Sequence, residues 1–190
     1  MKKLLLILTQ NITMKRLLIL LCLPLLFTTC KKEDEAPPAL AIGNEHQGGI
    51  IFWLDGNGGG LIAAPSGHMQ AAWGCNQTLI SGAYGTAIGT GAQNTIDIEA
   101  GCLTAGTAAD ICANLTLGGY SDWFLPSRDE LNEIEVNLFS EGIGGFANDR
   151  YWSSTQGLQG YAFSQSFYPP YPPNVEDKNH YLFVRAVRAF

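Results

Sequence analysis

Apolar and polar residues alternate in different ways along the chain, and each pattern predicts an element. Residues 49–54 are mostly β-branched or aromatic, residues 55–60 are rich in glycine, and residues 61–64 are apolar again. This pattern predicts a β-hairpin, because Asp-Gly and Asn-Gly pairs favour the backbone of tight turns. Asp55 and Asn57 could also begin a calcium loop, but no distal glutamate completes it, so we favour the turn.

Three helices are expected in the middle of the chain. Residues 94–101 begin with an Asn-Thr pair that can cap a short helix. Apolar residues at helical spacing over 108–115 predict a second helix, stopped by a pair of glycines, with Cys112 facing the core. Ser127 and Glu130 have the spacing of a capping box at the start of a third helix.

The period of the apolar residues changes to two in the last part of the chain, which predicts strands over 151–154, 162–167 and 181–190. Between the last two lies a loop, residues 168–174, whose four prolines exclude it from the interior of a sheet. We therefore predict an α+β fold, with one antiparallel sheet covered by two to three helices.

The N-terminal segment predicts export. Residues 17–27 form an apolar run of eleven residues, which is too short to span a bilayer but suits the core of a signal peptide. We expect the signal peptide to cover residues 1–29, with Met14, directly before Lys15 and Arg16, as a candidate for the true start.

Cys30 closes this run and resembles the lipidated cysteine of a bacterial lipoprotein signal. The lysines and acidic residues of 31–35 resemble the export tag of surface lipoproteins in the Bacteroidota. The alternative is a cysteine that merely follows a signal peptide. The resemblance implies an outer membrane lipoprotein, exposed at the surface, with residues 30–45 as lipid attachment site and flexible tether and a domain from residue 46 to 190.

Charge and motifs exclude several functions. The sequence has 11 Lys and Arg against 17 Asp and Glu; four of the basic residues lie in the predicted signal peptide, which leaves seven and a net charge of −10. Such a surface repels nucleic acid. The sequence also lacks the usual zinc, serine-hydrolase and phosphate-loop motifs, so we expect a protein that is not an enzyme and that uses no metal and no cofactor.

Three cysteines remain after export, which allows at most one internal disulfide. We favour Cys75–Cys102, because this bond would constrain a glycine-rich loop that has little core of its own. Cys102–Cys112 is the alternative, and it is disfavoured if Cys112 packs as a small apolar side chain inside the core.

Three separated motifs resemble a known family. Residues 119–127 (GYSDWFLPS), 151–154 (YWSS) and 184–190 (VRAVRAF) are similar to the family named for the C-terminal domain of the Legionella collagen-like protein. The resemblance covers about residues 46–190, and it implies a C-type-lectin-like fold and an adhesive role. The scarcity of basic residues argues against sulfated glycans and favours a neutral glycan, a peptide or a protein as ligand.

Several residues of these motifs are also expected in structural roles. Trp123 and Trp152 should lie in the core. Arg185 and Arg188 are three residues apart in a predicted strand, so they should point to opposite faces, and at least one should pair with a carboxylate such as Asp129 or Glu130.

Ligand contact is expected around the proline-rich loop, where exposed tyrosines adjoin polar side chains. The candidate binding residues are Tyr168, Tyr171, Asn174, Asn179, His180 and Tyr181. The favoured function is non-catalytic recognition of a surface glycan or protein. The alternative is an enzyme of lectin-like fold, similar in outline to formylglycine-generating enzymes, which would need a reactive cysteine pair or a metal.

Overall fold

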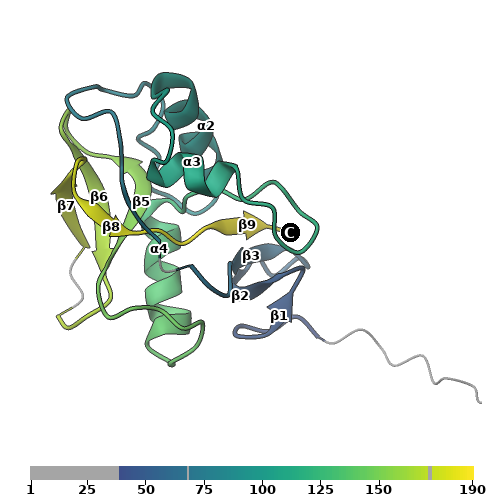
Figure 1. The fold of residues 1–190 in the computed structure, drawn as a ribbon. Helices are drawn as coiled ribbons and strands as arrows, with labels where there is room; N and C mark the ends of the chain where they lie inside the picture. The colour runs from purple at the N-terminus through teal and green to yellow at the C-terminus, as the bar shows by residue number, and fades with distance from the viewer. Residues whose placement is uncertain (1–38, 68, 171–172) are drawn as a thin grey trace, which may run out of the picture. The chain divides into compact units, whose positions relative to one another are not determined.

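Two β-sheets form the framework of the folded chain, whereas the pattern of apolar residues predicts one. The computed structural model describes residues 39–67, 69–170 and 173–190, which belong to one unit running from Ala39 to Phe190. The predicted signal peptide, Cys30 and Tyr171 lie outside the described residues. The sheets and the helices make a mixed α+β architecture, as predicted (Figure 1).

The first sheet is antiparallel and contains the predicted hairpin. Its strands, in spatial order, are β1 (Glu45–His46), β2 (Gly49–Leu54), β3 (Gly60–Ala63) and β9 (Val187–Ala189). At the turn between β2 and β3, Asp55 Oδ1 accepts the N–H groups of Asn57 at 2.7 Å and Gly59 at 2.9 Å. The carboxylate thus serves the turn itself, which agrees with the turn interpretation.

The second sheet is mixed. Its strands, in spatial order, are β4 (Gln70–Ala72), β8 (Tyr181–Phe183), β5 (Arg150–Gln156), β6 (Tyr161–Ser166) and β7 (Pro173–Asp177). The pair β5–β8 is parallel, and the other pairs are antiparallel. The prediction of one antiparallel sheet is therefore wrong.

Two predicted boundaries also differ from the structure. The expected strand 181–190 is divided into β8 and β9, which belong to different sheets. Pro173, expected in the loop, opens β7 opposite Gln165. An edge strand tolerates a proline because its outer side needs no N–H donor.

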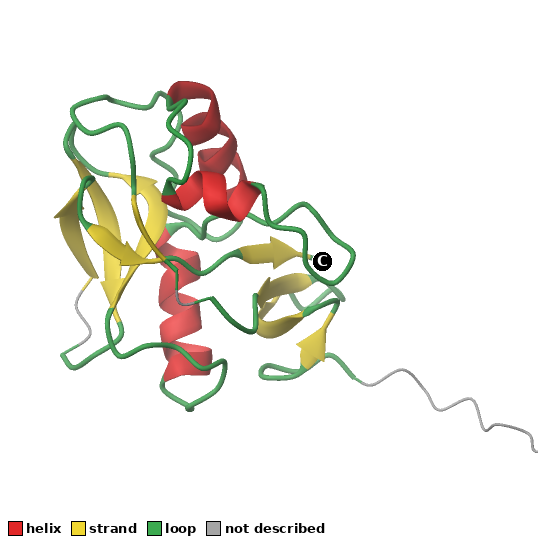
Figure 2. Cartoon of the chain, in the orientation of Figure 1, coloured by secondary structure: helices red, strands yellow, loops and turns green. Residues whose placement is uncertain are grey.

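The part of the chain that the structure describes has three α-helices, which pack on these sheets (Figure 2). Helix α2 (Gly91–Gly101) begins before the expected start at Asn94. The side-chain amide of Asn94 is buried instead of capping, and it donates to the carbonyl oxygen of Gly85 at 2.7 Å and to Ser154 Oγ at 3.2 Å. Asn94 therefore joins α2 to a preceding loop and to strand β5.

The other helices follow the predictions at their starts more closely than at their ends. Helix α3 (Ala108–Ala113) is capped by Thr107 and ends well before the glycines expected to stop it. Helix α4 (Arg128–Ile134) begins with the predicted capping box of Ser127 and Glu130. It continues as a π-helical segment, η2 (Glu135–Phe139).

The core lies between these layers. Helix α4 stands between the two sheets (Figure 1), and Leu131 clusters with Phe52 of β2 and Tyr151 of β5. A second cluster contains Trp123 and Trp152, which are 2% and 0% exposed, as predicted for core residues.

The folded unit begins before His46, where we expected the tether to end. The N–H of Gly43 donates to the carbonyl oxygen of Ile51 at 2.8 Å, and the N–H of Ile51 donates to that of Asn44 at 2.9 Å. Leu40 packs against the core. Residues 39–45 are therefore part of the domain.

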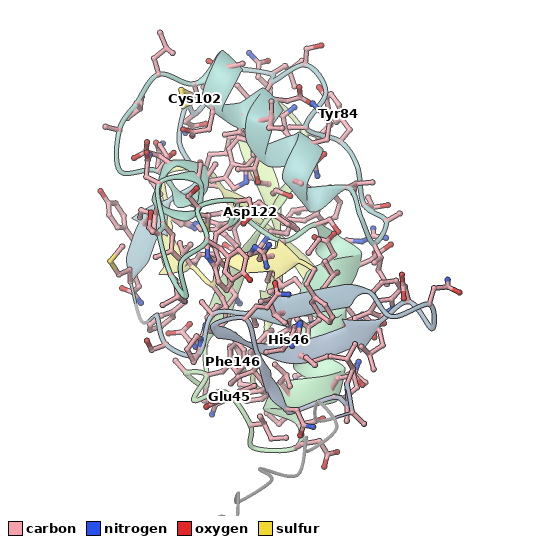
Figure 3. The ribbon with its side chains drawn as sticks, turned by 90° about the vertical axis from the view of Figure 1, so that its right-hand side faces the viewer. Glu45, His46, Tyr84, Cys102, Asp122 and Phe146 are labelled. Atoms are coloured by element: carbon pink, nitrogen blue, oxygen red, sulfur yellow. A yellow bond between two sulfur atoms is a disulfide. The ribbon has the colours of Figure 1, made fainter. Side chains whose placement is uncertain are left out.

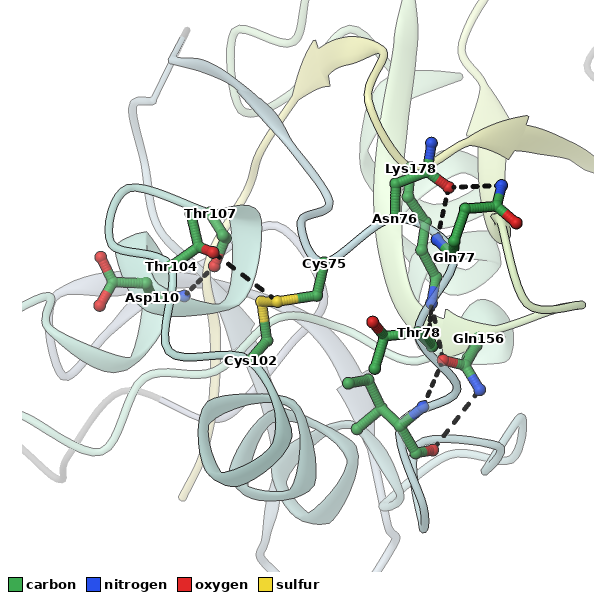
Figure 4. The surroundings of a disulfide bond; sticks show 11 residues. Cys75, Asn76, Gln77, Thr78, Cys102, Thr104, Thr107, Asp110, Gln156 and Lys178 are labelled. Carbon is green, nitrogen blue, oxygen red and sulfur yellow. Dashed lines mark hydrogen bonds between the residues drawn. A yellow bond between two sulfur atoms is a disulfide. The ribbon is translucent and has the colours of Figure 1, made fainter.

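The predicted disulfide is present. Cys75 and Cys102 are bonded, and they lie 27 positions apart in the sequence (Figure 4). Cys112 is free and fully buried in the core, as its helical position predicts. The bond ties the loop after β4 to the end of α2.

The two arginines near the C-terminus have other partners than expected. Arg185 donates to the carbonyl oxygens of Ala64 at 2.6 Å and Gly144 at 3.0 Å, and Arg188 pairs with Asp122. The prediction that at least one of them pairs with a carboxylate is confirmed by Arg188, but the partner is Asp122 and not Asp129 or Glu130. Glu130 instead accepts backbone N–H groups at the start of α4 and in the loop before α2. Both of its carboxylate oxygens are therefore already hydrogen-bonded and are not arranged to bind a guanidinium.

Candidate functional site

A cluster of polar side chains lies near the free edge of the second sheet. We call it the Glu176 cluster. It consists of Arg150, Tyr168, Asn174, Glu176 and His180. Three of these residues, Tyr168, Asn174 and His180, are candidates from the sequence, and the structure brings them together.

Strand pairing puts the cluster on one face of the sheet. Ser166 lies opposite Arg150, and Ser164 lies opposite Asn174. Cross-strand partners point to the same face, and residues two apart in one strand share it, so Glu176 joins Asn174 there. The face is therefore a consequence of the strand register.

Glu176 is the centre of the hydrogen bonds. Its Oε1 accepts from Arg150 and, at 3.2 Å, from the amide of Asn174. Its Oε2 lies 3.1 Å from His180 Nδ1. Arg150 also donates to the hydroxyl of Tyr168 at 3.1 Å. One carboxylate thus fixes the orientation of several side chains.

Exposure varies across the cluster. The Glu176 side chain is 10% exposed, whereas that of His180 is 60% exposed and that of Arg150 is 33% exposed. Because the charges of Glu176 and Arg150 balance, the site is polar without a strong net charge. A buried anchor with an exposed polar rim suits an uncharged polar ligand.

The remaining candidates lie beside the cluster along the chain. Asn179 and Tyr181 flank His180 and are both exposed, Tyr181 at 69%. The N–H of Asn179 donates to Asp177 Oδ1 at 2.9 Å, which shapes the turn between β7 and β8. Both side chains are exposed, but no contact joins them to the cluster in the described chain.

Sequence reasoning missed Arg150 and Glu176. The available signal was the alternation of Asn174 and Glu176, two residues apart in a strand, but the predicted loop extended to Asn174 and no strand was predicted after it. Ser164 was also missed: its Oγ is buried on the same face and has no hydrogen-bond partner within the described chain.

The opposite face of the same strands is apolar. Tyr161, Phe163 and Val175 surround a shallow hollow together with Leu158, which is 78% exposed. The guanidinium of Arg128 lies 5.5 Å from the centre of the Phe163 ring. The two faces of β6 and β7 therefore differ sharply in chemistry.

The chemistry available elsewhere is limited. Burial raises the pKa of the Cys112 thiol, which disfavours the thiolate that a nucleophile needs. Within residues 39–67, 69–170 and 173–190, no group of three or more His, Cys, Asp or Glu side chains could hold a metal ion. In the same ranges no helix has both the length and the apolar character needed to cross a bilayer.

The chain matches no protein-family model, and a search of curated proteins finds no relative for it. The family resemblance therefore rests on the three motifs at 119–127, 151–154 and 184–190. In the structure these motifs carry structural roles: Trp123 and Trp152 fill the core, and Arg185 and Arg188 link loops to the sheets.

Proposed function

We propose that this protein is a non-catalytic recognition or adhesion domain at the cell surface, with a C-type-lectin-like fold. We also propose that it is related to the family of the C-terminal domain of the Legionella collagen-like protein, which its three motifs resemble. The proposed ligand is a neutral glycan or a protein. The proposed anchor is a lipid on Cys30, which would hold an exported domain at the outer membrane.

The observation that carries the proposal is the Glu176 cluster. It holds the amide of Asn174 and the exposed ring of His180 within one small area, both positioned by the largely buried Glu176 carboxylate. Sugar hydroxyls both donate and accept hydrogen bonds, so they match such a mixed set. Tyr168, whose hydroxyl accepts from Arg150, supplies an aromatic ring beside these groups.

The proline-rich segment beside the cluster supports the same use. Pro169, Pro170 and Pro173 limit the backbone freedom of the connection between β6 and β7. A connection that is already stiff loses little entropy when a ligand binds to its side chains.

An enzyme of lectin-like fold has less support. Such an enzyme would draw on a reactive cysteine pair, but Cys75 and Cys102 are bonded to each other and Cys112 is buried. A sulfated ligand is also disfavoured, because Arg150 of the cluster is already paired with Glu176.

Binding to an array of neutral glycans and candidate surface proteins tests the proposal. The test variant is Asn174→Ala/His180→Ala, which removes ligand contacts and leaves the Arg150–Glu176 pair in place. The matched control is Tyr161→Ala, on the opposite face of the same sheet. We expect the test variant to lose binding by about tenfold or more and the control to keep it.

The opposite pattern would count against the site. If the folded Asn174→Ala/His180→Ala variant binds as wild type does, the Glu176 cluster is a structural feature and recognition lies elsewhere. Labelling with radioactive palmitate tests the anchor separately: Cys30→Ala should abolish the label, and a label that persists refutes lipidation at Cys30.

A further inference from the structure

A second hollow, lined by none of the residues of the Glu176 cluster, opens between helices and a loop. Its volume is about 360 Å³. The lining residues are Ala92, Thr95, Ile96 and Glu99 of α2, Ala113 of α3, and Asp122, Trp123 and Phe124 of the loop that precedes α4. Figure 3 shows Asp122 at its place between the helices and the hairpin strands.

The floor of the hollow is apolar. Trp123 and Phe124 are 2% and 6% exposed, and Ile96 at the rim is 60% exposed. The hydroxyl of Thr95 is already hydrogen-bonded within the structure. It donates to the carbonyl oxygen of Gly91 and accepts the N–H of Leu125. An aliphatic group entering the hollow would therefore meet carbon surface on most sides.

Glu99 places an unused acceptor in this setting. Its Oε1 atom is buried and has no hydrogen-bond partner among the described residues. Burial, with a further contribution from the charge of Asp110, raises the pKa of Glu99. A buried carboxylate oxygen without a donor costs free energy, and a cation could recover that cost.

The other carboxylate of the hollow behaves differently. Asp122 is paired with Arg188, and this contact lowers the pKa of Asp122. The two carboxylates therefore differ in their partners. Asp122 forms an ion pair with Arg188, whereas no ion pair of the described chain includes Glu99.

We propose that this hollow binds a lysine side chain of a partner protein, with the ammonium group on Glu99 and the aliphatic stem against Trp123 and Ile96. The argument rests on charge complementarity between one carboxylate and one ammonium, set beside an apolar floor. A lysine suits the hollow because its four-carbon stem can lie on the apolar floor while its compact ammonium group donates to the Glu99 carboxylate, for which no hydrogen bond is present in the described chain. This inference does not depend on the proposed function.

The test is a titration of the folded protein followed by amide chemical shifts. The probe is Nα-acetyl-lysine methylamide, and its neutral counterpart is Nα-acetyl-norleucine methylamide. We expect the lysine probe to shift the amides of Ile96, Glu99 and Trp123 and to bind about tenfold or more tightly than the norleucine probe, since a charge-assisted hydrogen bond is lost in the latter.

Two variants make the assignment specific. Glu99→Gln removes the charge without breaking any hydrogen bond of Glu99 Oε1, and we expect it to weaken the lysine probe about tenfold. Asp97→Asn, on the same helix and hydrogen-bonded to Gln93, is the matched control and should bind as wild type does. An unchanged amide spectrum away from the hollow shows that each variant folds.

Three results would overturn the proposal. They are equal binding of the lysine and norleucine probes, unchanged binding of the lysine probe by folded Glu99→Gln, and no shifts at the hollow with any probe. A further titration uses n-pentylamine as the probe. If this free amine binds more tightly than the lysine probe, the site recognises small amines and the assignment to a lysine side chain is wrong.

Discussion

The ammonium group of Lys178 lies 4.3 Å from the centre of the Trp73 ring, inside the domain. Its Nζ donates to the carbonyl oxygen of Thr78 at 2.8 Å and to Gln156 Oε1 at 2.7 Å, as Figure 4 shows for these hydrogen bonds. No carboxylate accompanies it among the ion pairs of the described chain. Burial lowers the pKa of Lys178 from 10.5 to about 8.

This pKa predicts an increase in stability with rising pH. Between pH 8 and 10.5 the unfolded chain keeps the Lys178 proton and the folded chain releases it, so the unfolded state binds more protons and the free energy of unfolding rises. We expect wild type to gain up to about 3 kcal/mol relative to Lys178→Met across this range. Urea unfolding of both proteins at pH 7, 8, 9 and 10 measures it. A difference that is constant with pH would contradict the prediction.

The disulfide should contribute strongly to stability. Cys75 and Cys102 close a loop of 27 positions, and constraining such a loop in the unfolded chain is worth about 3 to 4 kcal/mol. We expect Cys75→Ala/Cys102→Ala to lose this amount in the free energy of unfolding, measured by urea denaturation. Cys112→Ala, which breaks no bond, is the control, and it should not reproduce the loss caused by removing the disulfide.

Gly74 should tolerate no side chain. Its φ is +101°, and an added Cβ would collide with the methyl group of Thr107 and lie 3.3 Å from Cys102 Sγ. We expect Gly74→Ala to cost about 2 to 4 kcal/mol, from backbone strain and overpacking together. Gly106→Ala is the matched control, because Gly106 has φ +75° but open space around its missing Cβ. Thermal unfolding should show a clearly smaller loss for Gly106→Ala, and equal losses would refute the steric argument.

Arg185 should be irreplaceable by lysine. Its guanidinium lies 4.0 Å over the Phe146 ring and donates to Ala64 and to the neighbouring carbonyls of Gly144 and Gly145. An ammonium group has neither the planar shape nor the reach to serve these acceptors together. We expect both Arg185→Lys and Arg185→Met to lose about 2 to 4 kcal/mol in chemical denaturation. A loss below about 1 kcal/mol for Arg185→Lys would show that charge alone suffices.

Local features of the fold could be predicted from the sequence. The hairpin of β2 and β3 follows from the turn residues after Leu54, and the capping box follows from the spacing of Ser127 and Glu130. The disulfide followed from the glycine-rich loop that it closes. Each of these depends on residues whose chemistry acts over a short stretch of chain or on a covalent bond.

Features that depend on distant contacts could not be predicted. The partner of Arg188 is Asp122, which lies 66 positions away and carries no local signal of that role. The division of residues 181–190 between two sheets is equally non-local, because a strand pattern does not say which sheet it joins. For the same reason Arg150 and Glu176 of the Glu176 cluster were not predicted. Arg150 reaches Glu176 only after β5, β6 and β7 have paired.

The separation of β8 from β9 has a consequence for the timing of folding. Residues 181–190 leave the ribosome after every other strand has been made, yet they supply one strand to each sheet, and Phe190 exchanges backbone hydrogen bonds with Gly60. Without β8, strand β4 is not joined to β5, and without β9 the hairpin lacks its outer neighbour. A chain without residues 181–190 would therefore complete neither sheet.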